Sequence, residues 1–110
     1  MAVAYRDFEI KGTVEFVVDV IGGPEDLTGY TGAMMIRGLR DDAVPLATVP
    51  TDGITVDAVN RQVTVRIPSI VTDLYTWERG VYDLVITGPS ADRWPLVEGR
   101  VINQQLVTRS

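Results

Sequence analysis

Apolar and polar residues alternate along short stretches of this chain, and glycine, proline, aspartate and asparagine interrupt the alternation at nearly regular intervals. In the stretch 13–20, every second residue is apolar: Val14, Phe16, Val18 and Val20. Polar residues such as Glu15 and Asp19 lie between them. Because successive side chains of a strand point to opposite faces, this period of two predicts a β-strand with one buried and one wet face.

The same alternation predicts further strands, over 31–39, 44–49, 54–58, 63–67, 81–87 and 94–102, with a last pairing over 106–108. In 81–87 it places Tyr82, Leu84 and Ile86 on the inward face. Both faces of 31–39 are apolar, which is typical of a central strand or of one that a partner covers. Pro45 and Pro50 place 44–49 at a sheet edge, because proline cannot donate a hydrogen bond to the ladder.

Three connections carry predictions of their own. Residues 59–61 are expected to form a hairpin turn, with Asn60 in the left-handed conformation that asparagine tolerates. The apolar spacing within 70–77 predicts one or two helical turns, with Ser69 as the N-terminal cap. Gly99 marks a β-bulge or a close approach of another backbone.

Many short strands, each with one apolar face to cover, favour two packed sheets over one open sheet. The length of 110 residues suits one core, and the chain shows neither a linker nor an internal repeat. We therefore expect an all-β, immunoglobulin-like antiparallel β-sandwich with one short helical turn, as a single domain over 1–110. Because the Cys-Trp-Cys spacing of antibody domains is missing, the pattern leaves the strand topology open.

Composition excludes several classes of function. The chain has no cysteine and no histidine, so it has no disulfides, no thiolate metal ligands and no imidazole base. The net charge of −5 repels a phosphate backbone, so we expect no direct nucleic-acid partner. No apolar run is long enough to span a membrane, and the first residues lack the pattern of a secretory signal. We expect synthesis in the cytoplasm and no membrane partner.

Acidic pairs are the obvious place to look for catalysis, since glycoside hydrolysis needs two carboxylates at a set distance. All of them lie in or beside predicted turns, where aspartate commonly accepts hydrogen bonds from its own backbone. The sequence has no calcium-loop or P-loop pattern, and Ser69 and Thr72 have no activating base. We therefore predict no enzyme, and no catalytic, cofactor-binding or metal-binding residues. The acidic pairs are Glu25 with Asp26, Asp41 with Asp42, and Asp52 with Asp57.

The two tryptophans are large amphipathic rings, which belong in a core or at an interface with protein or sugar. Core packing is the favoured interpretation of Trp77, whereas core and interface both remain open for Trp94. The alternative for the predicted interface as a whole is ordinary core for Met34 and ordinary surface for the rest. The predicted interface contains Met34, Met35, Leu39, Trp94, Leu106 and Val107.

Short motifs follow one another along most of the chain: Asp26-Leu27-Thr28-Gly29-Tyr30, Ile36-Arg37, Gly80 with Tyr82 and Asp83, Gly99 with Val101, and Val107-Thr108-Arg109. In this order the chain resembles small virion proteins of tailed bacteriophages, including the N-terminal domain of upper baseplate proteins of siphophages. The resemblance implies an immunoglobulin-like sandwich that attaches one virion component to another, and it brings no catalytic residues.

We therefore expect a non-enzymatic structural protein of a phage virion. It would be an adaptor or attachment module of the tail, baseplate or fibre region that docks to other virion proteins in a symmetric, multi-copy assembly. The alternatives are a carbohydrate-binding or host-surface recognition module and a capsid decoration protein. Saturable sugar binding that is lost on Trp94→Ala would favour the carbohydrate-binding module.

Overall fold

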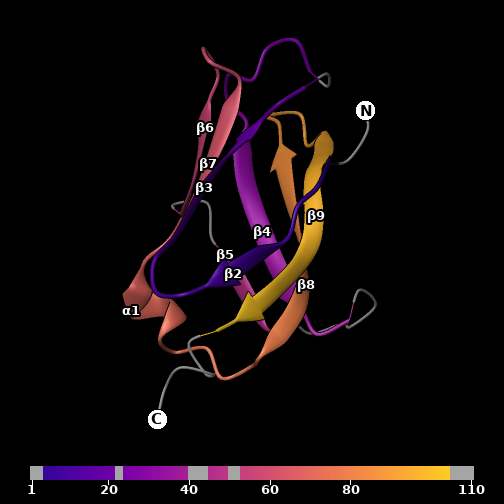
Figure 1. Cartoon of the computed structure of the whole chain (residues 1–110). Helices are drawn as coiled ribbons and strands as arrows, with labels where there is room; N and C mark the ends of the chain where they lie inside the picture. Colours follow the sequence, from indigo (N-terminus) through magenta and orange to yellow (C-terminus); the bar gives the residue numbers. More distant parts are fainter. Residues whose placement is uncertain (1–3, 22–23, 40–44, 50–52, 105–110) are drawn as a thin grey trace.

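Two β-sheets pack face to face in the computed structural model, which describes residues 4–21, 24–39, 45–49 and 53–104 (Figure 1). The strands of the larger sheet are β1 (Ala4–Tyr5), β2 (Phe8–Ile10), β4 (Thr31–Arg37), β5 (Ala47–Val49), β8 (Arg79–Thr87) and β9 (Arg93–Asn103). Those of the smaller sheet are β3 (Val14–Asp19), β6 (Ile54–Asp57) and β7 (Gln62–Ile67). One helical turn, α1 (Ser69–Thr72), lies between β7 and β8.

The larger sheet has the strand order β1-β9-β8-β4-β5, with β2 also paired to β9, and the smaller sheet has the order β3-β7-β6. In immunoglobulin-like domains the strands named B, E and D share one sheet, and C, F and G share the other. Here β3, β7 and β6 take the first set of places, and β4, β8 and β9 take the second. The predicted all-β, immunoglobulin-like sandwich with one short helical turn is therefore confirmed.

The core lies between the sheets and is built from every second residue of the strands. The burial pattern of β3 alternates strictly between buried and exposed, as its period of two predicted. On β8 the inward residues are Tyr82, Leu84 and Ile86, again as predicted. Burying each such side chain stabilises the fold by about 1.5–3 kcal/mol, so the alternation decides which face of every strand is covered.

The N-terminal strands depart from the antiparallel pattern, because β1 and β2 both run parallel to β9. Between them, Arg6 and Asp7 cross β9 at Gly99. A Cβ at Gly99 would lie 2.0 Å from the Arg6 carbonyl oxygen, so this approach requires glycine. That carbonyl accepts a hydrogen bond from the Tyr82 hydroxyl, and Asp7 Oδ1 accepts the backbone N–H of Arg100 at 2.8 Å. Side chains thus replace the ladder hydrogen bonds where the strand is interrupted.

Aromatic side chains beside the break between β1 and β2 pack against both sheets. The Phe8 ring of β2 lies 5.3 Å from the Phe16 ring of β3 and 4.8 Å from the Tyr82 ring of β8, measured between centroids. The Arg6 guanidinium lies 4.9 Å from the centroid of Phe16, and its Nη1 donates to the Val17 carbonyl at 3.1 Å. The segment between β1 and β2 therefore joins the edge of the larger sheet to β3 of the smaller one.

Two local predictions are wrong. The left-handed residue of the β6–β7 hairpin is Arg61, with a φ of 52°, and not Asn60. Asn60 is held by Asp57, which accepts the Asn60 backbone N–H at 3.1 Å and the Asn60 side-chain amide at 2.8 Å. Pro68, not Ser69, takes the cap position of α1 and makes no side-chain cap bond, while the Ser69 backbone N–H donates to Thr13 Oγ1 at 3.1 Å.

The remaining predictions for the strands have mixed outcomes. The edge position of β5 and the central position of β4 between β8 and β5 are confirmed. Gly99 marks a close backbone approach, and the register irregularity of β8 lies between Leu84 and Val85. The sequence pattern did not predict β1 and β2, and the predicted pairing over 106–108 lies outside the described residues.

We expect Gly99→Val to destabilise the sandwich by about 3 kcal/mol, because the new side chain would meet backbone atoms that cannot move aside without breaking the β1–β9 pairing. Urea unfolding, followed by circular dichroism, measures the loss. Ala33→Val is the control, since it enlarges an exposed residue of β4 and should change the midpoint little. Equal midpoints for Gly99→Val and the wild type would contradict the close approach.

Candidate functional site

The outer face of the smaller sheet carries complementary cross-strand pairs. Glu15 of β3 lies opposite Arg66 of β7, with 3.4 Å between Oε2 and Nε. Asp19 lies opposite Gln62, whose side-chain amide donates to the Asp19 carboxylate at 3.1 Å. Such pairs satisfy polar groups within the sheet itself. This face is therefore suited to contact with water.

The outer face of the larger sheet has a different pattern at its centre. Asp83 of β8 lies directly opposite Glu98 of β9, and like charges in this position destabilise an antiparallel pair. Met35 of β4 extends the same row on one side, and Tyr5 of β1 extends it on the other. We call Met35, Asp83, Glu98 and Tyr5 the carboxylate row.

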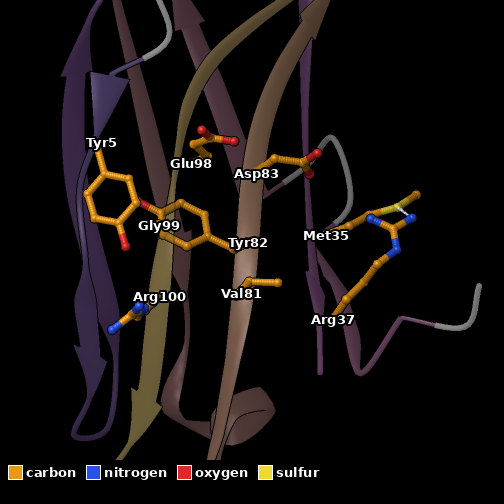
Figure 2. Close-up of a pocket in the computed structure, with 9 residues that line it drawn as sticks. All are labelled: Tyr5, Met35, Arg37, Val81, Tyr82, Asp83, Glu98, Gly99 and Arg100. Carbon is orange, nitrogen blue, oxygen red and sulfur yellow. Dashed lines mark hydrogen bonds between the residues drawn. The ribbon is translucent and has the colours of Figure 1, made fainter. Parts of the chain in front are cut away.

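The neighbouring row carries the opposite charge. Arg37, Val81 and Arg100 lie opposite one another across β4, β8 and β9, and we call them the arginine row. The Arg37 guanidinium turns back to the preceding row, where Nη2 lies 3.2 Å from the sulfur of Met35 (Figure 2). Together the two rows line a shallow depression of about 150 Å³.

Apolar side chains on this face are only partly covered. Tyr5 is 63% exposed and Met35 is 37% exposed, while Val81 is half-buried between its neighbours. Single exposed apolar residues are ordinary on a soluble protein. Here they flank a pair of like charges, so a covering partner would bury apolar area and bring counter-charges to the carboxylates at the same time. The arrangement is typical of a docking surface.

Tyr82 lies below this depression and belongs to the fold rather than to a reaction. Burial raises the pKa of Tyr82 to about 12, so its hydroxyl is a neutral hydrogen-bond donor at physiological pH. The acceptor is the Arg6 carbonyl. Within the part of the chain that the structure describes, no three aspartate or glutamate residues gather closely enough to hold a metal ion. In the same residues, no helix has the length and apolar character needed to cross a membrane.

The acidic pairs of the sequence stabilise turns where the structure describes them. Asp26 accepts the Thr28 backbone N–H at 2.9 Å, which lowers the pKa of Asp26. Hydrogen bonds from the side chain and backbone of Asn60 lower the pKa of Asp57. Both aspartates are thus engaged by their own turns, as expected. Of the other members, Asp41, Asp42 and Asp52 lie outside the described residues, and Glu25 takes part through its backbone carbonyl, which accepts from Arg61 Nη1 at 2.9 Å.

The structure separates the members of the predicted interface. Met34 is fully buried, so its assignment to an interface is wrong: it alternates with Met35 along β4 and points into the core. Met35 lies in the carboxylate row, and Leu39 is exposed just beyond the end of β4. Leu106 and Val107 lie outside the described residues.

Both tryptophans pack against the core. For Trp77 this agrees with the favoured prediction, which was core packing. Trp94 lies opposite the buried Ile86, and since directly opposed residues share a face of the sheet, Trp94 lies on the inner side of β9. Its indole Nε1–H donates to Asp92 Oδ2 at 3.0 Å. Trp94 therefore does not belong to the face that carries the carboxylate row.

Asp92 connects two motifs that lie far apart in the sequence. It accepts hydrogen bonds from the Tyr30 hydroxyl and from the Trp94 indole, and so joins the loop before β4 to the turn between β8 and β9. These bonds, first that from Tyr30, hold the pKa of Asp92 below its ordinary 3.8. The same bond to Asp92 raises the pKa of Tyr30. The Asp-Leu-Thr-Gly-Tyr motif thus has a structural role, which includes burying Leu27.

The sequence contains little that would identify this face in advance. Alternation within β8 and β9 indicates which of their residues point outward, but not which outward residues lie opposite each other. That depends on the register between strands, and a shift of register would separate Asp83 from Glu98. Tyr5 joins the face through the pairing of β1 with β9, which no local pattern indicates.

Comparison with known proteins adds little to this description. No family model matches the chain, and no curated protein matches it. Among solved structures, extracellular domains 3–5 of Drosophila OTK are similar to it, with 11% sequence identity and a TM-score of 0.35. That similarity covers 92% of this chain and 33% of the OTK structure, so the chain spans about a third of that structure's length.

We expect Asp92→Asn to lower the Tm at neutral pH, because it removes the negative charge from the acceptor of two hydrogen bonds. A carboxylate whose pKa is lowered by folding stabilises the protein above its unfolded pKa, here 3.8, and loses that effect as the pH falls through the folded value. The Tm difference between wild type and variant should therefore shrink below pH 3.8. Thermal unfolding at a series of pH values measures it, and a difference that is constant with pH would contradict the role of the charge.

Proposed function

We propose that this chain is a non-enzymatic docking module, and that it serves as a structural protein of a phage virion. Its docking surface is the outer face of the larger sheet, with the carboxylate row and the arginine row at the centre. One observation carries the proposal: Asp83 and Glu98 lie directly opposite each other, like charge against like charge, among apolar residues that are only partly covered.

The physical reason is that this face gains from being covered. Covering Tyr5, Met35 and Val81 removes apolar surface from water, which is favourable by roughly 25 cal/mol per Å². A partner with basic groups also relieves the repulsion between Asp83 and Glu98. The outer face of the smaller sheet exposes Val17 but gains less from a basic partner, because the polar residues opposed there, such as Glu15 and Arg66, are complementary to each other.

The virion assignment rests on the resemblance of the sequence motifs to small tail and baseplate proteins. A docking module without catalytic groups suits that setting, because symmetry repeats each contact many times and avidity multiplies a modest interface. Attachment in the tail, baseplate or fibre region remains the favoured position, and capsid decoration is the alternative within the virion. Sugar recognition has less support, since Trp94 is half-buried and bonded to Asp92.

We expect Val81→Glu to reduce the incorporation of the chain into phage particles by about tenfold or more, because it places a carboxylate between Arg37 and Arg100, where it neutralises the arginine row, and removes an apolar contact. Val17→Glu is the matched control: it makes the same substitution in the middle of β3, on the outer face of the smaller sheet. Quantitative mass spectrometry of purified particles gives the number of copies of each variant per particle.

Circular dichroism and Tm values must first show that both variants fold. Normal incorporation of the control together with loss of Val81→Glu supports docking through the larger sheet. Equal incorporation of the two variants would exclude that face as the docking surface. Absence of the wild-type chain from purified particles would exclude the virion role altogether.

A further inference from the structure

The charges on the outer face of the larger sheet are arranged as a dipole along the strands. The carboxylate row holds Asp83 and Glu98, and the arginine row, two residues along each strand, holds Arg37 and Arg100. Two residues of a strand span about 6.8 Å, so the negative and positive rows lie close together. A surface with adjacent rows of opposite sign is complementary to itself after a half-turn that exchanges the rows.

We propose that the occupant of this face is a second copy of the same chain, related by a two-fold axis that lies in the plane of the interface between the two rows. The half-turn places the carboxylate row of each copy over the arginine row of the other. Glu98 then faces Arg100 of the second copy, and the same contact occurs again by symmetry. Asp83 lies over Val81 of the second copy, flanked by that copy's two arginines.

This orientation is selected by the charges. A half-turn about an axis that runs through the carboxylate row would place Asp83 and Glu98 over carboxylates of the second copy, and like charges held together at an interface cost several kcal/mol. The half-turn between the rows instead gives each carboxylate an arginine within reach, and it brings Met35 over Arg37 of the second copy. Apolar contact and charge pairing are therefore satisfied by one arrangement.

The face is also large enough. The larger sheet is built from β1, β2, β4, β5, β8 and β9, with 2, 3, 7, 3, 9 and 11 residues. At about 3.4 Å per residue and a strand spacing of about 4.8 Å, these residues give a plane of roughly 570 Å². Side chains make the accessible area larger than the plane, which brings it near the roughly 800 Å² per partner of stable interfaces. Two twisted sheets pack with their strands about 30° apart, which keeps the paired rows in contact near the axis.

The inference deepens the proposed function, on which it rests for the choice of face, by naming the first partner of the docking module. It is tested on the purified chain alone. Sedimentation equilibrium should give twice the 12.1 kDa mass of one chain at high concentration and a dissociation on dilution. A mass of one chain at every concentration up to the millimolar range would overturn the inference.

Charge reversal tests the proposed orientation. Glu98→Arg alone places arginine against arginine at both symmetric contacts, and Arg100→Glu alone places glutamate against glutamate. Each variant should dimerise on the order of 100-fold more weakly than the wild type. An equimolar mixture of the two should form a one-to-one heterodimer. In the mixture, the two arginines of one variant face the two glutamates of the other, so each contact again joins opposite charges.

Recovery in the mixture also shows that both variants fold. Glu15→Arg, on the outer face of the smaller sheet, is the matched control and should dimerise like the wild type. Dimers that tolerate Glu98→Arg, or a mixture that does not associate, would overturn the two-fold arrangement. These outcomes are independent of particle incorporation: a monomeric chain that still needs Val81 to enter virions would leave the docking function standing and remove the second copy as its partner.

Discussion

The crossing of the N-terminal segment over Gly99 is the constraint on which the larger sheet depends. It carries the Arg6 carbonyl toward the core, where an unsatisfied oxygen would be costly, and the Tyr82 hydroxyl supplies the missing donor. The register is the same before and after the crossing, since Tyr5 pairs with Glu98 and Phe8 with Val101. The edge of β9 is thereby covered without any shift of its outward residues.

Burial in the core stabilises the fold enough that the outer face can carry an unfavourable charge pair. Each buried Val, Ile or Leu contributes about 1.5–3 kcal/mol, whereas a cross-strand pair on the surface changes stability by only about 0.2–1 kcal/mol. The opposition of Asp83 and Glu98 therefore costs little against a core that spans both sheets. The fold therefore tolerates a like-charge pair on its outer face. Such a pair affects the binding of a partner more than it affects the free energy of unfolding.

The sequence predicted the sandwich well because burial imposes a period of two that can be counted without a structure. It placed Tyr82 and Ile86 inward and β5 at an edge. It did less well where the outcome depends on partners far away in the chain: β1 and β2 have few residues each and are strands only through β9. Met34 and Met35 show a similar limit. They are adjacent and equally apolar, so the sequence does not say which of them points into the core, and only the packing of the sheets decides it.

The net charge of −5 opposes self-association, whereas the carboxylate row and the arginine row favour it in one orientation. At physiological ionic strength the Debye length is about 8 Å, so the repulsion between two acidic copies is weak until they nearly touch. At contact, the pairing of Glu98 with Arg100 of the second copy acts over a few ångströms and outweighs what remains of that repulsion. The long-range charge therefore slows encounter and discourages random contacts, while the short-range rows determine which orientation persists.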